Sequence, residues 1–197
     1  MNDVINLVRV PPSATKAQIA ECLKKIKAAG KNSIQVVRAP FFEKEMNIAL
    51  GDVPRNAESI RKALYNEDFF VGAAANALLE SKDYMSAVEG AMIRVGVVSG
   101  TELGFTKDFV FAELVHQANK FGLRPLISEA GPKLRLAYVR QMPTRVHVVT
   151  KPLRLGGHRY LFCLDNVEGG GRYLSAIKVD QNTQFGPDSL WAVHIAP

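Results

Sequence analysis

Histidine and cysteine have the widest chemical use of the side chains in this sequence, because they serve as metal ligands, general bases and nucleophiles. No two histidines stand four positions apart and no HExxH motif is present, so a zinc site would need ligands from distant elements. The two cysteines form no CxxC motif and lie in apolar stretches, which is typical of buried thiols. We therefore expect no metal site, no cofactor and no catalytic residue. The side chains concerned are His116, His147, His158, His194, Cys22 and Cys163.

A hairpin could still bring some of these groups together. His147 and His158 would face each other across a short turn, and Cys163 or Asp165 could then complete a cluster. No GxSxG motif or other flanking signature marks a nucleophile near Cys163. An enzyme that uses His147, His158 or Cys163 therefore stays an alternative hypothesis.

A polar group near the middle of the chain is the candidate ligand-binding site. Arg135 and Tyr138 are three positions apart, which places them close together on a helix, and Arg140 follows. Arginine side chains are well suited to bind carboxylates and phosphates. The alternative is structural, with Arg135 anchoring its helix to a backbone carbonyl or to Glu129. The candidate ligand-binding residues are Arg135, Tyr138 and Arg140.

The charge of the chain favours anionic partners only weakly. Lysine and arginine number 25 against 19 acidic residues, for a net charge of +6, and the basic residues form no long run. A cluster of lysines on the first predicted helix could contact phosphates, although a solvated helix face is the better explanation. The hydrophobic share of 47% and charged share of 22% are those of a folded globular protein. The lysines are Lys16, Lys24, Lys25 and Lys27.

The N-terminal part is predicted to have a β-α-β start and a helical middle. The prolines that follow Val4–Val10 and Ser33–Ala39 end two β-rich segments, and an amphipathic segment between them ends at Gly30. Asn56 opens a helical segment that runs through Tyr65. The alanine-rich segment Phe69–Ser81 predicts a buried helix.

The C-terminal part is predicted to hold two helices and four strands. Thr106 or Asp108 can cap a helix that ends at Gly122, and a second helix is expected from Glu129 to about Arg140. After Arg145 the apolar residues recur with a period of two, and glycine-rich turns separate the segments, which predicts antiparallel strands. The turn NVEGGGR at 166–172 could be a ligand loop or an ordinary hairpin turn.

The fold class that follows is α+β. We expect a mixed N-terminal half with a β-α-β start, and a C-terminal half in which two helices pack on a four-stranded antiparallel sheet. The expected domains are residues 1–91 and residues 92–197.

The second half also resembles a small domain of many bacterial proteins to which no activity is assigned. The shared features are LGF at 103–105, a helix, GL at 122–123 and the motif ExGPxLRLxY, followed by strands. This resemblance implies a boundary near residue 92 and an α+β build, and it carries no mechanism. The motif falls on Glu129, Gly131, Pro132, Leu134, Arg135, Leu136 and Tyr138.

The sequence favours a non-catalytic binding or interaction module in a bacterial cytoplasm. The N-terminus lacks the basic segment followed by an apolar segment that is typical of a signal peptide. No apolar run approaches the ~20 residues of a membrane span. We expect the partner to be another protein or an anionic ligand, with nucleic acid as an alternative and no membrane contact.

Overall fold

The computed structural model describes residues 6–10, 14–28, 34–38, 40–51, 56–87, 90–139 and 144–196. Its helices are α1 Lys16–Ala28, α2 Ala57–Asn66, α3 Ala73–Leu79, α4 Phe111–Lys120 and α5 Ala130–Ala137. Its strands are β1 Asn6–Val10, β2 Ile34–Arg38, β3 Lys44–Leu50, β4 Phe69–Val71, β5 Ala91–Ser99, β6 Phe109–Val110, β7 Leu123–Arg124, β8 Arg145–Val148, β9 Leu153–Leu155, β10 His158–Val167, β11 Gly171–Lys178, β12 Gln184–Phe185 and β13 Leu190–Ile195. Within these ranges, no helix has both the length and the apolar character that a membrane crossing requires.

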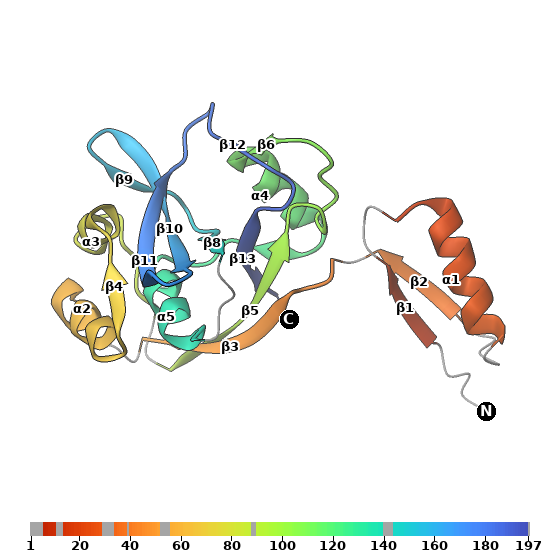
Figure 1. Ribbon diagram of the computed structural model, residues 1–197, viewed down its shortest axis with the longest axis horizontal. Coiled ribbons are helices and arrows are strands. Elements are labelled where there is room, and N and C mark those ends of the chain that lie inside the picture. The colour runs from red at the N-terminus through yellow and green to blue at the C-terminus, as the bar shows by residue number, and fades with distance from the viewer. Residues whose placement is uncertain are drawn as a thin grey trace.

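A curled nine-stranded sheet forms the main body (Figure 1). Its order is β3-β5-β13-β8-β10-β11-β4, and β7 and β9 add to β13 and β10. The sheet is mixed, because β13 runs parallel to β8 and β11 runs parallel to β4, whereas the other neighbours are antiparallel. The strands at its two ends, β3 and β4, come from the N-terminal part of the chain.

Helices cover both faces of this sheet, and the alternation of side chains along β13 shows the two layers. Leu190 and Ala192 point into a core shared with α2, α3 and α5, whereas Trp191 and Val193 point into a second core shared with α4. Successive residues of a strand face opposite sides, so a strand covered on both sides is apolar almost throughout. The sequence LWAVHI has this character.

The predicted arrangement of two helices on a four-stranded antiparallel sheet is wrong. The four predicted strands exist as β8, β10, β11 and β13, but they belong to a larger, mixed sheet that β3, β4 and β5 extend. The two helices do not share a face either, because α4 packs into one core and α5 into the other. Pairing with strands far away in the sequence decides this architecture, and local periodicity does not report such pairing.

The predicted buried helix Phe69–Ser81 is also wrong at its start. Residues Phe69–Val71 form β4, which pairs in parallel with β11, and the helix begins only at Ala73. As a strand, β4 buries Phe69 and turns Phe70 outward, with 3% and 55% of each residue exposed. This change of element places an aromatic side chain on the surface.

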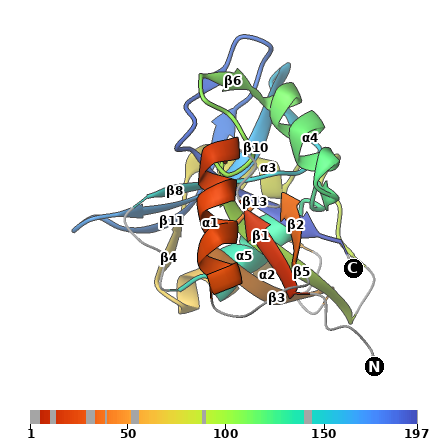
Figure 2. The same ribbon diagram turned by 90° about the vertical axis from the view of Figure 1, so that its right-hand side faces the viewer.

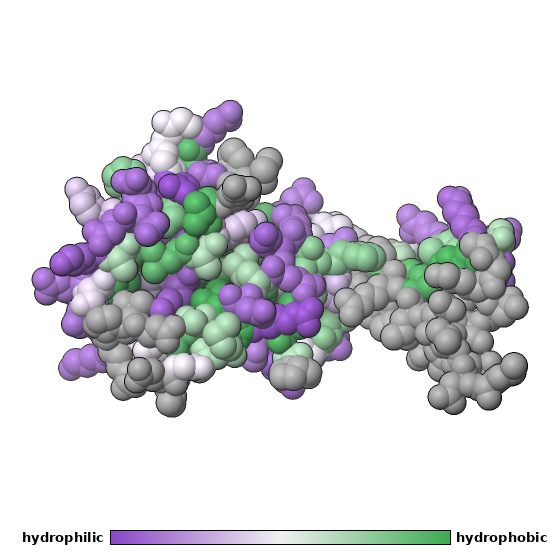
Figure 3. Space-filling model, turned by 90° about the horizontal axis from the view of Figure 1, so that it is seen from below, coloured by the Kyte–Doolittle hydropathy of each residue, from purple (hydrophilic) through white to green (hydrophobic). Residues whose placement is uncertain are grey.

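The β-α-β start is present, because α1 connects the parallel strands β1 and β2. This unit lies to one side of the main body in Figure 1, and Figure 2 looks onto it from its far side. Seen from below, the main body mixes hydrophilic and hydrophobic residues (Figure 3). The boundary between residues 91 and 92 stays a prediction, although β3 and β5 pair across it along their lengths.

Glu129 connects three segments at the start of α5. One carboxyl oxygen accepts a hydrogen bond from the backbone N–H of Gly51, and the other accepts one from that of Ala87, both at 2.7 Å. The backbone N–H of Glu129 donates to the carbonyl of Met85 at 3.1 Å. Since only 4% of Glu129 is exposed, water cannot easily replace these contacts.

We predict that Glu129→Gln lowers the free energy of unfolding by about 1–3 kcal/mol, because an amide nitrogen cannot accept a hydrogen bond and one backbone N–H loses its partner. Urea unfolding measures this. Glu113→Gln is the matched control, because the exposed Glu113 accepts through one oxygen only, from Val110, and glutamine retains such an oxygen. Equal losses in both variants would contradict the role of Glu129.

Candidate functional site

The structure brings His147 and Cys163 together on neighbouring strands. They are directly opposite each other on β8 and β10, and His147 Nδ1 lies 3.3 Å from Cys163 Sγ. Only 5% of His147 and 1% of Cys163 are exposed. The imidazole packs against the rings of Trp191 and Phe185, with ring centroids 4.5 Å and 5.2 Å away. A substrate therefore has no open approach to this pair.

Burial also holds both groups in their uncharged forms. Burial lowers the pKa of His147 to about 4, with a further lowering by the nearby charge of Arg145. Burial raises the pKa of Cys163 far above that of a free thiol. Because the thiolate is the nucleophile, a neutral imidazole beside an un-ionised thiol gives no reactive cysteine at neutral pH.

The pairing of His147 with His158 in the alternative hypothesis does not form. His158 lies opposite Leu155 in the exposed β9–β10 hairpin, at the far end of β10 from the partner strand β8. In the part of the chain that the structure describes, no three histidine, cysteine or acidic side chains are placed to hold a metal ion.

Arg135, the first of the predicted ligand-binding residues, has internal contacts. Arg135 is fully buried, and its guanidinium donates a hydrogen bond to the backbone carbonyl of Tyr138. The guanidinium also lies over the ring of Phe69, 4.7 Å from the centroid, and that of Arg172 lies 4.5 Å from the same centroid. Burial lowers the pKa of Arg135 to about 10, and the charge of Arg172 adds to this effect. These contacts match the structural alternative for Arg135.

The other two predicted residues differ in how far the structure describes them. Tyr138 ends α5 and is half-buried, and its pKa is raised by burial and by the charge of Glu43. Arg140 lies outside the described residues. A ligand site at Arg135, Tyr138 and Arg140 stays a prediction.

A different group of side chains lies on an uncovered part of the sheet. The register places Phe70 opposite Tyr173, Tyr173 opposite Asp165, and Asp165 opposite Arg145, so the four side chains form one row across β4, β11, β10 and β8. Val167 is two residues from Asp165 and shares its face. We call these five residues the open face; they are Phe70, Arg145, Asp165, Val167 and Tyr173.

The polar end of the open face is an ion pair. Arg145 Nε and a terminal nitrogen donate to the two carboxyl oxygens of Asp165 at 2.6 Å and 3.1 Å. Burial alone would raise the pKa of Asp165, but hydrogen bonds from Arg145 and Ser175 outweigh it and lower the pKa overall. The pair contributes one charge of each sign, so this end of the open face is locally neutral.

The apolar end is an aromatic pair, of which Phe70 is exposed and Tyr173 is half-buried. The rings of Phe70 and Tyr173 stack with centroids 5.1 Å apart, and 55% of Phe70 and 52% of Val167 are exposed. The glycine-rich turn after β10 fits this surface, because a side chain at Gly171 would meet the Phe70 ring at 3.0 Å. The backbone of Gly171 also has a φ of 98°, which favours glycine. The turn is therefore explained as a hairpin turn that accommodates an aromatic ring.

Comparison with family models, with curated proteins and with solved structures finds no match to this chain. The resemblance of the second half to a bacterial domain therefore stays a prediction.

The open face was not predictable from local sequence, because its residues come from four strands. Phe70 was assigned to a buried helix, and Arg145, Asp165 and Tyr173 stand in separate segments that only the register aligns. The available signal was the pair Phe69-Phe70 ahead of Gly72. Two adjacent aromatic residues in a short strand must face opposite sides, so one of them leaves the core.

We predict that stability falls as the pH is lowered because of His147. Its pKa is about 4 in the folded chain and about 6.5 when unfolded, so the unfolded state binds more protons between these values. The contribution of the neutral imidazole to the free energy of unfolding is complete above pH 6.5 and is lost as the pH falls toward 4. Urea unfolding at pH 7 and pH 4.5 should show a smaller loss in His147→Phe than in the wild type, by about 2 kcal/mol.

The control for this experiment is His158→Phe, the same replacement at an exposed position. It should keep the pH dependence of the wild type. If His147→Phe and His158→Phe respond alike, the buried neutral state of His147 is wrong.

Proposed function

We propose that this chain is a non-catalytic binding module that holds another protein against its open face. The observation that carries the proposal is the row from Phe70 to Arg145, which combines an aromatic pair, exposed at Phe70, with an exposed arginine. Aromatic residues and arginine are enriched in protein interfaces and contribute most of their binding energy.

The chemistry of the molecule supports binding over turnover. The most reactive pair that the described residues offer, His147 and Cys163, is enclosed between strands and kept uncharged. The open face itself contains no histidine, cysteine or pair of carboxyl groups. Its carboxyl group, Asp165, is engaged by Arg145 and Ser175.

The composition of the open face favours a protein partner over a polyanion. The charge of the exposed Arg145 is balanced by Asp165, and Phe70 and Val167 contribute exposed apolar area. Such a surface gains free energy mainly by burying apolar area, at about 25 cal/mol per Å². A folded partner with a complementary apolar patch can supply that area.

We predict that a photo-crosslinking residue at Phe70 captures a protein. The chain is expressed in its native host with Phe70 replaced by p-benzoylphenylalanine and irradiated. The expected result is a covalent adduct that protease destroys and nuclease does not. The adduct is detected by a shift in mass on a denaturing gel and identified by mass spectrometry.

The control places the same residue at Tyr65, which is 78% exposed on α2. Capture of one defined protein from Phe70, and not from Tyr65, supports the proposal. Capture from neither position, or the same mixture from both, contradicts it.

Single-stranded nucleic acid is a second candidate, favoured by the stacked pair Phe70 and Tyr173 on a sheet face. Exposed aromatic rings on sheets stack on bases, at about 1–3 kcal/mol per base. The net charge of +6 would add attraction for phosphates.

This candidate predicts that a labelled dT12 oligonucleotide binds, that added salt weakens the binding steeply, and that Phe70→Ala weakens it about 5-fold to 100-fold. Fluorescence anisotropy measures the three effects, with Tyr65→Ala as the control variant. Absence of binding at low salt removes nucleic acid from the account.

A further inference from the structure

Most arginine side chains that the structure describes have an internal partner. Arg61, Arg94 and Arg145 pair with carboxyl groups of Glu80, Glu45 and Asp165. Arg124 bonds to a side-chain amide, and Arg135 and Arg172 bond to backbone carbonyls. Arg154 and Arg159 differ from these six, because no described residue forms a hydrogen bond or ion pair with either guanidinium.

These two arginines lie directly opposite each other. The β9–β10 register aligns Arg154 with Arg159, and both are exposed. Opposed residues in an antiparallel pair have their Cβ atoms about 4.5–5.5 Å apart, and like charges in that position destabilise the strands. An anion between the two guanidinium groups would turn this repulsion into attraction.

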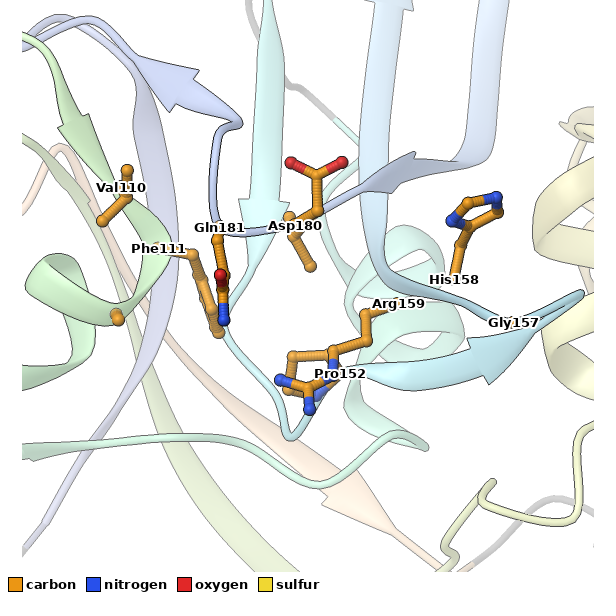
Figure 4. Close-up of a pocket in the computed structure, with 10 residues that line it drawn as sticks. Val110, Phe111, Pro152, Gly157, His158, Arg159, Asp180 and Gln181 are labelled. Carbon is orange, nitrogen blue, oxygen red and sulfur yellow. The ribbon is translucent and has the colours of Figure 1, made fainter.

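A cavity of about 290 Å³ lies beside Arg159. Phe111, Pro152 and Val179 give it an apolar wall, and Asp180 and Gln181 add polar groups. Figure 4 shows the side chain of Arg159 extending toward Pro152, whereas the imidazole of His158 points to the other side of β10. Arg159 thus belongs both to the arginine pair and to the wall of a space that a small molecule can enter.

The other charges nearby are compatible with an anion at the arginine pair. The carboxyl group of Asp180 points away from Arg159 in Figure 4, and it is bonded within its own turn by Asn182 and Thr183. Lys178 lies 3.6 Å from it and offsets its charge. Just before α4, the backbone N–H of the N-cap residue Val110 donates to the carboxyl group of Glu113.

We propose that Arg154 and Arg159 bind the phosphate group of a small phosphate ester whose organic part occupies the adjoining cavity. A phosphate monoester carries close to two negative charges at neutral pH, which matches two guanidinium groups. Each guanidinium can donate two parallel hydrogen bonds to phosphate oxygens. Gln181 can bond to hydroxyl groups of the ester, and Phe111 and Val179 pack against its carbon atoms. This site lies at the opposite end of β10 from the open face and does not depend on the proposed protein partner.

Isothermal titration calorimetry at low ionic strength tests the site, with glycerol 3-phosphate, inorganic phosphate and acetate as probes. We expect glycerol 3-phosphate to bind, and Arg154→Gln and Arg159→Gln each to raise its dissociation constant at least about tenfold, since each removes a charged, forked donor. Tighter binding of the ester than of inorganic phosphate supports an organic ligand. Equal binding of the two assigns the site to free phosphate.

The control variant is Arg124→Gln, which removes an exposed arginine from β7 and should leave binding unchanged. A thermal melt gives a second readout, because phosphate should raise the melting temperature of the wild type and of Arg124→Gln but not of Arg159→Gln. The proposal is overturned if neither phosphate probe binds, if acetate binds as tightly as both, or if Arg124→Gln weakens binding as much as Arg159→Gln. Binding that is confined to the dT12 oligonucleotide overturns it as well.

Discussion

The alternation of side chains along the sheet is the constraint on which the rest of the structure depends. Strands such as β10 and β13 are covered on both faces, so successive residues enter different cores. One core is closed by α2, α3 and α5 and the other by α4. A shift of one residue in register would exchange the two sets of side chains and place Trp191 or Phe162 in the wrong layer. The same constraint fixes the register that places His147 opposite Cys163 and Arg154 opposite Arg159.

Whether a side chain on β10 is buried or exposed depends on which other elements pack over that part of the strand, and this determines its chemistry. At Cys163 both faces are covered, so the thiol and its neighbour His147 are buried, uncharged and unreactive. Two residues along the same face, at Asp165, the cover is incomplete and the side chain pairs with an exposed arginine. At Arg159, toward the other end, the strand borders a cavity. Along one face of β10, the environment therefore changes from the cavity beside Arg159, through the buried core at Cys163, to the open face at Asp165.

The sequence predicted those parts of the fold that local periodicity determines. The alternation around Phe162 located β10, and the apolar segment LWAVHI located β13. The apolar positions on α4, and the cap and proline signals at the start of α5, located those helices to within a few residues. Pairings between distant segments were not predictable, because nothing near Lys44–Leu50 or Phe69–Val71 records that they extend a sheet formed mostly by later residues. The four-stranded sheet was wrong for that reason.

The candidate site was predictable to an even smaller extent. Arg135 was predicted as a ligand-binding residue because it stands near a tyrosine. Its guanidinium is in fact buried over Phe69, and the local sequence does not distinguish a buried arginine from an exposed one. The open face and the Arg154–Arg159 pair both depend on which residues are opposite each other across strands. That information appears only once the register is known.

Hydroxyl-radical footprinting of Phe70 and Tyr173 tests the central claim most directly, which is that an uncovered part of the sheet serves as a contact surface. The side chains are oxidised in the purified chain and again inside the native host, and mass spectrometry compares their oxidation with that of Tyr65. The account predicts ready oxidation of Phe70 in the purified chain and selective protection of Phe70 and Tyr173 in the cell. Protection of Phe70 in the purified chain, or equal oxidation of all three residues in both settings, would contradict it.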